Sequence, residues 1–159
     1  MKYNFRKIEE KDNKAIAKIV RDNLEQVGLD IPGTAYFDEG LDHLSELYKN
    51  ENGKYFVLID ELDNVVGGVG FSPCDFMDDT AELQKLYLSD SVKGSGLGYE
   101  MLHFIEDEMR ACGFRKVYLE THTVLKAALH IYEKTGYYLI PRPNEVIHST
   151  MDSFYVKDL

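Results

Sequence analysis

The sequence predicts a mixed α/β fold, because strand patterns and helix patterns alternate along the chain. Apolar runs at residues 55–59 and 65–71 flank a polar turn, which is typical of a β-hairpin. A strand at 80–88 leads into a glycine-rich turn, then an amphipathic helix, and then a strand at 116–120. Two strands joined by one helix favour parallel neighbours in a sheet. We therefore expect an α+β mixed sheet.

The remaining elements follow from hydrophobic periodicity and from residues that begin or end helices. Strands are predicted at 2–8, 55–59, 65–71, 80–88, 116–120, 137–140 and 153–156. Helices are predicted from an N-cap at Asp12 to near Gly28, over 41–48, from Leu97 to Gly113, and from Leu125 to Gly136. A turn at 50–53 closes the second helix. These elements form about six to seven strands and about four helices, which we expect to make one domain over residues 1–159.

Composition excludes several classes of function. The 18 basic and 28 acidic residues give a net charge of −10, and an acidic surface repels nucleic acid, so we expect no nucleic-acid partner. No apolar run reaches membrane-spanning length, and the first residues lack the apolar segment of a signal peptide, so we expect no membrane contact. Cys74 and Cys112 lie far apart in the sequence. They fit inert thiols in a reducing compartment, which predicts a cytoplasmic location.

The glycine-rich turn at residues 93–99, called the glycine turn below, predicts an anion-binding site. Gly94, Gly96 and Gly98 leave backbone N–H groups uncovered where a helix begins, and the helix dipole adds positive potential. A dinucleotide fingerprint would need a third glycine where Tyr99 stands, and a P-loop would need lysine after its last glycine. Both of those sites are therefore excluded.

Two motifs resemble the GCN5-related N-acetyltransferase (GNAT) superfamily. Residues 93–98, Lys-Gly-Ser-Gly-Leu-Gly, resemble its pyrophosphate loop Gln/Arg-x-x-Gly-x-Gly/Ala, with lysine in the first position. Residues 128–137 resemble its block Ala-x-x-x-Tyr-Glu-Lys-x-Gly-Phe. The two motifs occur in the family's order, with a strand between them. The resemblance covers residues 83–140 and implies the GNAT acyl-CoA N-acyltransferase fold, with a mostly antiparallel central sheet.

The resemblance implies an enzyme that moves an acetyl group from acetyl-CoA directly to a primary amine in a ternary complex. Tyr132, at the family's tyrosine position, is the expected acid for the departing thiolate, and Glu82 is the expected base, with Glu120 as a weaker alternative. The pantetheine arm is expected along strand 80–88, and the pyrophosphate at the glycine turn. The expected acetyl-CoA-binding residues are Leu86, Tyr87, Leu88, Lys93, Gly94, Ser95, Gly96, Leu97, Gly98 and Tyr99.

Several properties stay open at this stage. A non-catalytic acyl-CoA-binding or sensory domain of the same fold is the alternative function, and a longer acyl-CoA is an alternative donor. The acceptor is expected to be a small-molecule or peptide amine. We expect no metal, because the five histidines are scattered. A homodimer is a candidate assembly, formed by pairing or exchange of the strand around residues 154–156.

Overall fold

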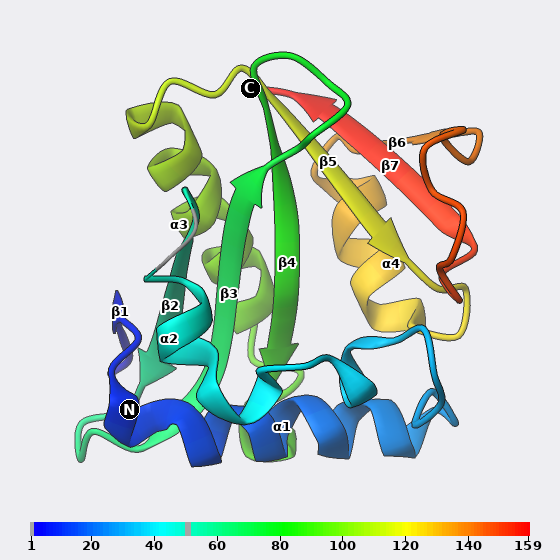
Figure 1. Ribbon diagram of the computed structural model, residues 1–159. Helices are drawn as coiled ribbons and strands as arrows, with labels where there is room; N and C mark the ends of the chain where they lie inside the picture. Colours follow the sequence, from blue (N-terminus) through cyan, green and yellow to red (C-terminus); the bar gives the residue numbers. More distant parts are fainter. Residues whose placement is uncertain (1, 50–51) are drawn as a thin grey trace.

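The predicted strands lie in one seven-stranded sheet of order β1-β2-β3-β4-β5-β7-β6 in this computed structural model, which describes residues 2–49 and 52–159 (Figure 1). The bounds are β1 Asn4–Lys7, β2 Lys54–Ile59, β3 Val65–Pro73, β4 Thr80–Leu88, β5 Lys116–Thr121, β6 Tyr138–Ile140 and β7 Ser153–Asp158. Neighbouring strands run antiparallel except β4 and β5, which are parallel as predicted.

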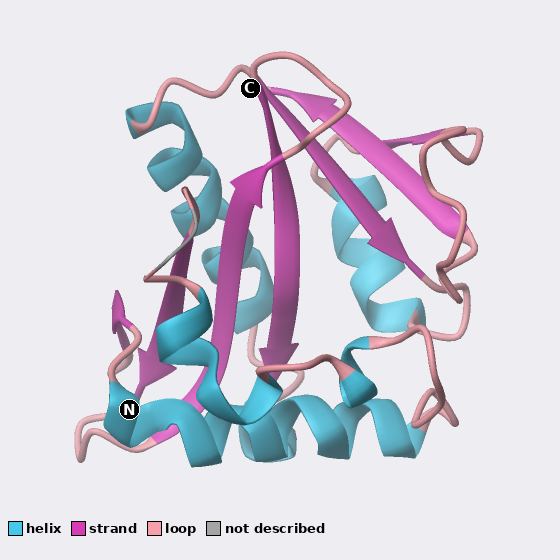
Figure 2. Ribbon diagram, in the orientation of Figure 1, coloured by secondary structure: helices cyan, strands magenta, loops and turns pink. Residues whose placement is uncertain are grey.

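Helices cover both faces of the sheet (Figure 2). The helices are α1 Asn13–Gln26, α2 Leu44–Leu47, α3 Leu97–Ala111 and α4 Lys126–Lys134. The apolar stripes of α3 and α4 bury against one face, where Met101, Leu102 and Ile105 are fully buried. The stripe of α1 buries against the other face, over Tyr55 and Val57. None of the helices within the described residues is long and apolar enough to cross a membrane.

The first helix, α1, begins directly after Asp12, as predicted, but the Asp12 side chain does not cap it, and the extent of α2 differs from the prediction. Asp12 precedes α1, but its carboxylate accepts the Glu9 amide at 2.8 Å and pairs with Arg6 at 2.7 Å, so it caps the preceding 3-10 turn and not α1. The helix predicted over 41–48 is a 3-10 turn followed by a single α-helical turn. In the turn predicted at 50–53, residues 50 and 51 lie outside the described residues.

The β4 and β5 strands pair only at their beginnings and then separate (Figure 1). Their register runs from Thr80 opposite Lys116 to Glu82 opposite Tyr118 and ends there. On its other side, β4 carries a bulge: Gly68 pairs with Tyr87 and Gly70 with Gln84, so β4 has one residue more than β3 in this interval. A bulge bends its strand and increases the local twist. This bulge lies just after Glu82, the last residue of β4 that pairs with β5.

The glycines of β3 make room for an aromatic ring that supports this bulge. A Cβ atom at Gly68 would lie 2.6 Å from the Tyr55 hydroxyl oxygen, and one at Gly70 would lie 2.5 Å from the Tyr55 ring. The Tyr55 hydroxyl donates to the carbonyl oxygen of Lys85 at 2.8 Å, and Lys85 has a positive φ of 49°. The close approach that glycines predict within a strand is therefore made by Tyr55.

The strand around residues 154–156 lies inside the sheet, so of the two expected routes to a homodimer, pairing or exchange of this strand, pairing is not available to it. β7 pairs with β5 on one side and with β6 on the other, and Phe154, Tyr155 and Val156 are buried. A strand with both neighbours in place has no unpaired backbone to offer a second copy. The sheet ends at β6 on this side.

Candidate active site

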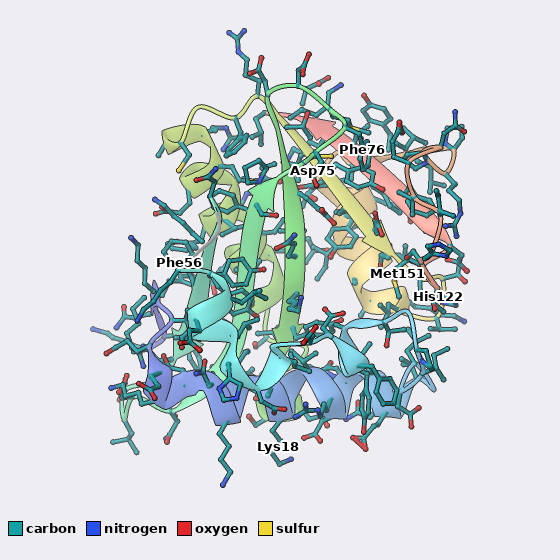
Figure 3. All side chains as sticks on the ribbon, viewed as in Figure 1. Lys18, Phe56, Asp75, Phe76, His122 and Met151 are labelled. Carbon is teal, nitrogen blue, oxygen red and sulfur yellow. The ribbon has the colours of Figure 1, made fainter. Side chains whose placement is uncertain are left out.

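A cavity of about 720 Å³ occupies the gap that opens between β4 and β5. Its walls include the end of α1, the second half of β4, the glycine turn, the end of β5, and α4. In the loop before β7, Met151 lines the cavity, close to His122 at the end of β5 (Figure 3). The imidazole Nε2 of His122 lies 3.5 Å from Asp152, so this loop is held against β5.

The glycine turn presents unpaired backbone amides to the cavity. Gly94 and Gly96 have φ values of 77° and 82°, a conformation that favours glycine, and α3 begins at Leu97. Among the described residues, no backbone or side-chain group accepts the amides of 94–99. Free amides at a helix N-terminus bind anions because the dipole and the N–H donors act together. The turn thus has the geometry of a phosphate site.

Not every predicted residue of the turn reaches the cavity. Gly94, Gly96, Gly98 and Tyr99 line it, and a Cβ at Gly98 would lie 2.7 Å from Ile131 of α4, so α4 packs closely on the turn. The side chains of two other residues serve the fold. The hydroxyl of Ser95 donates to the carbonyl of Val92, and Leu97 is buried in the core under α3.

Lys93 lines the cavity but already has a charged partner. Its ammonium nitrogen lies 2.8 Å from a carboxylate oxygen of Asp90 and 3.5 Å from the amide oxygen of Gln26. Lys93, and then Gln26, lowers the pKa of Asp90 below its usual value. Part of the lysine charge is therefore compensated within the protein.

The second half of β4 offers a free strand edge to the cavity. Leu86, Tyr87 and Leu88 line it, and no residue of β5 pairs with them. The side-chain amide of Asn23 donates to the Leu88 carbonyl at 2.9 Å, so α1 fixes the end of this edge. An unpaired edge can bind an extended ligand as an added strand.

Tyr132 of α4 supplies a phenol to the cavity. The side chain lines the cavity while the residue is only 6% exposed, and its ring contacts those of Tyr137 and Tyr155 at centroid distances of 5.6 and 6.2 Å. Within residues 2–49 and 52–159 no group forms a hydrogen bond with its hydroxyl. Burial raises the pKa of Tyr132 well above its usual value, so the phenol stays protonated at neutral pH. It can therefore donate a proton to a group in the cavity.

Glu82 and Glu120 lie where β4 and β5 part, and only Glu120 lines the cavity. Glu120 accepts a hydrogen bond of 2.9 Å from the Tyr118 hydroxyl. Burial, and then the charge of Glu120, raises the pKa of Glu82 from 4.5 to about 7. A carboxylate with a pKa near neutrality is suited to accept a proton, whereas Glu120 has the more direct access to a ligand.

Sequence reasoning missed the cavity residues of α1. Asn23 and Gln26 both line the cavity. Asn23 donates a hydrogen bond to the end of β4, and Gln26 donates one to the carboxylate of Asp90. A signal for Asn23 exists: it falls on the apolar stripe of Ile16, Ile19, Val20, Leu24 and Val27, where a polar side chain needs a buried partner. Across the described chain, His, Cys, Asp and Glu side chains form no group of three that could hold a metal ion.

Comparison with known proteins agrees with this geometry. Residues 15–137 match the acetyltransferase (GNAT) family. The chain is 34% identical over 135 residues to an uncharacterized N-acetyltransferase, YjgM, of Escherichia coli (strain K12), over 84% of this chain and 80% of that protein. Two solved structures share the fold of this chain.

The first is a GNAT-family acetyltransferase of Staphylococcus aureus Mu50, with a TM-score of 0.87, 17% identity and coverage of 99% of both chains. The second is yncA of Salmonella typhimurium, a putative acetyltransferase solved with acetyl-CoA, with a TM-score of 0.75, 20% identity, and coverage of 100% of this chain and 95% of that one. The resemblance drawn from the two sequence motifs is confirmed. This chain belongs to the acetyltransferase (GNAT) family and is an acyltransferase.

Proposed function

We propose that this protein transfers the acetyl group of acetyl-CoA directly to a primary amine while both substrates are bound. The observation that carries the proposal is the cavity between β4 and β5, because an anion-binding turn, a free strand edge and a buried phenol all face it. The Salmonella structure with acetyl-CoA supports the identity of the donor. The acceptor is a small-molecule or peptide amine, and two free cysteines support a reducing, cytoplasmic location.

Each part of acetyl-CoA has a matching part of the cavity. The pyrophosphate binds the amides of 94–99, and the side chain of Lys93 adds a positive charge. The pantetheine arm lies along residues 86–88 and pairs with the free edge of β4. The thioester then enters the gap beyond Glu82, where backbone amides near Leu86 polarise its carbonyl oxygen.

The acceptor must lose a proton before it attacks. An alkyl amine with a pKa near 10.4 is neutral in about one molecule in 2,500 at pH 7, which costs roughly 4.6 kcal/mol. Glu82, directly or through Glu120, takes this proton. The amine lone pair then forms the C–N bond, and negative charge collects on the carbonyl oxygen.

Collapse of this tetrahedral intermediate breaks the C–S bond and releases a thiolate. Tyr132 donates its phenolic proton to the sulfur, and the nitrogen of the new amide loses its second proton to solvent. The products are CoA as a free thiol and an N-acetylated amine. Before the next cycle, Glu82 releases its proton to solvent and Tyr132 regains one from solvent.

Two measurements test the proposal. Titration calorimetry with acetyl-CoA must show binding, and its absence at millimolar concentrations contradicts the assignment of the cavity. A thiol reagent must then detect CoA release that depends on an added amine. Binding without such release favours an acyl-CoA sensor over an enzyme.

The role of Tyr132 is tested by Tyr132→Phe, which removes the hydroxyl and keeps the ring. We expect kcat to fall about a hundredfold with little change in the Kd of acetyl-CoA, because a general acid acts in the transition state. An unchanged kcat across pH means that Tyr132 is not the acid.

A further inference from the structure

A buried polar cluster lies in the apolar core beneath Tyr132. Glu106 of α3 is 1% exposed and accepts a hydrogen bond from the Tyr137 hydroxyl at 2.7 Å. The ammonium group of Lys157, on β7, lies 3.1 Å from both carboxylate oxygens of Glu106 and 5.4 Å from the centre of the Tyr137 ring. Three elements that are distant in sequence therefore meet at one carboxylate.

Stability alone does not account for this cluster. Taking a carboxylate and an ammonium group out of water costs free energy that their attraction often only balances. Apolar residues of similar volume often stabilise a core equally well, and here Glu106 is buried while the Lys157 side chain is 18% exposed. A buried ion pair does fix geometry, because each partner must stay within hydrogen-bond distance of the other. The cluster can therefore fix the position of a neighbouring group.

Tyr137 contacts both Glu106 and Tyr132, so it links the cluster to Tyr132. The ring of Tyr137 contacts the ring of Tyr132 at 5.6 Å, and its backbone amide donates to the Tyr132 carbonyl at 3.0 Å. The Tyr137 hydroxyl, which the ring contact with Tyr132 does not use, is the group that reaches Glu106. The Glu106 carboxylate thus restrains the ring on which Tyr132 rests.

On the other side, Tyr155 completes the support. Its ring contacts Tyr132 at 6.2 Å, and its strand also carries Lys157. Tyr137 is tied to Glu106 through its hydroxyl, whereas the Tyr155 hydroxyl donates to Glu133 at 3.3 Å and Tyr155 is linked to Glu106 only through Lys157, two residues later on β7. The Tyr132 hydroxyl has no hydrogen bond among the described residues, so packing of its ring sets its direction.

We infer that Glu106 is a positioning residue, which aims the Tyr132 hydroxyl at the thioester sulfur through Tyr137 and Lys157. This inference rests on the proposed role of Tyr132 as the proton donor. Small displacements of a catalytic group cost large factors in rate, because proton transfer needs a narrow geometry. Loss of the cluster therefore affects the chemical step and leaves acetyl-CoA binding at the glycine turn intact.

The test compares variants of the cluster in two backgrounds, with Tyr132 present and with Tyr132→Phe. Glu106→Leu removes the acceptor, Tyr137→Phe removes the donor, and Glu106→Gln keeps an oxygen for the Tyr137 hydroxyl. With Tyr132 present, we expect Glu106→Leu and Tyr137→Phe to lower kcat about tenfold, with the KM for acetyl-CoA changed less than about twofold. Glu106→Gln should restore part of the loss. In the Tyr132→Phe background, the same changes should leave kcat unaltered.

Asp12→Asn is the matched control, since Asp12 is a buried carboxylate paired with Arg6 at a distance from the cavity. It should lower the melting temperature and leave kcat unchanged. If Glu106→Leu does not fold, Tyr137→Phe carries the test, because it deletes a single hydroxyl. An equal loss of kcat in both backgrounds, or no loss in a folded variant, overturns the inference about Glu106 alone. An unchanged kcat in Tyr132→Phe overturns the proposed acid as well.

Discussion

The ammonium group of Lys93 lies 2.8 Å from Asp90, so a phosphate at the glycine turn must compete with a carboxylate for it. Both side chains are exposed, at 40% and 62%, and exposed pairs contribute little because water and salt screen them. The contact nevertheless lowers the positive potential that the turn presents to an anion. Asp90 is therefore a natural place to measure how the charge of Lys93 contributes to binding.

Asp90→Asn should tighten acetyl-CoA binding by about two- to fivefold at low salt, because the lysine charge is released toward the phosphates. Titration calorimetry measures this change, and it should shrink as ionic strength rises. Asp107→Asn is the matched control, since Asp107 pairs with Arg110 at 3.0 Å on the exposed, later part of α3. Equal effects of the two substitutions would mean that only net charge matters.

Glu82 gives a pH dependence of stability with a definite sign. Its pKa is raised from 4.5 to about 7, chiefly by burial. Between these values the folded protein holds a proton that the unfolded chain releases, so Glu82 makes stability fall as pH rises from 4.5 to 7. Above pH 7 the folded state must bury the charge.

Glu82→Gln removes this dependence. Relative to wild type, the variant should gain stability between pH 5 and pH 8 by at most about 3 kcal/mol, measured by urea unfolding at each pH. If the free energy of unfolding changed with pH in the same way in both proteins, the prediction would be contradicted.

Glu82 also predicts a pH dependence of activity: the kcat/KM of the wild-type protein should rise through about pH 7. The kcat/KM of Glu82→Gln should lack this rise near pH 7. The same pH profile of Glu120→Gln is the comparison.

The role of a single residue could be predicted where the pattern that indicates it lies in neighbouring positions of the sequence. Three alternate glycines at the start of a helix predict free backbone amides because those amides belong to the turn itself, and among the described residues the amides of 94–99 have no acceptor. The cavity role of Asn23 depends on the Leu88 carbonyl, 65 positions away, and no local pattern carries that contact. The partner of Lys93 is three residues before it, yet the spacing alone does not state whether the charge faces Asp90 or a ligand.

At the scale of elements, the bulge in β4 lies where this strand separates from β5. Tyr55 supports it from the neighbouring strand through the hydrogen bond to the Lys85 carbonyl, and the ring fills the space left by Gly68 and Gly70. The ring is 1% exposed, so water does not replace the bond if the hydroxyl is lost. The shape of the cavity therefore depends on a residue that does not line it.

Tyr55→Phe should lower the free energy of unfolding by about 1–2 kcal/mol, because a buried carbonyl loses its donor. It should also weaken acetyl-CoA binding, since the free edge of β4 shifts. Ser45→Ala is the matched control: it removes a buried hydrogen bond of 2.9 Å with Asn13, at the opposite end of α1 from the cavity residues. Urea unfolding and calorimetry on both variants should show a similar loss of stability but weaker binding only for Tyr55→Phe.

Elements with strong periodicity were predicted well, and weakly patterned ones were not. β4 has the predicted bounds of residues 80–88, and the parallel contact with β5 follows from the helix that joins them. The helix expected over 41–48 was wrong in extent, because Gly40, in a left-handed conformation, starts a 3-10 turn that leaves only four α-helical residues. Short helices depend on packing more than on pattern.

For the whole molecule, the net charge of −10 affects how charged acceptors arrive. An acidic protein attracts cations over a distance that salt shortens. With acetyl-CoA saturating, kcat/KM for a dicationic amine should fall more steeply with added NaCl than kcat/KM for a monocationic amine. Initial rates over a range of about 20 to 300 mM salt measure both slopes. Equal slopes would mean that the overall field does not guide the acceptor.

The position of β7 bears on when the protein becomes active during its synthesis. Residues 80–132, which include the glycine turn and Tyr132, are made before residues 153–158. Until β7 pairs with β5, Tyr132 lacks Tyr155 and Glu106 lacks Lys157, so one wall of the cavity has no support. Contacts between distant segments form late because their loops are costly to close. A growing chain thus carries both motifs of the family before the strand that supports Tyr132 and Glu106 has been made.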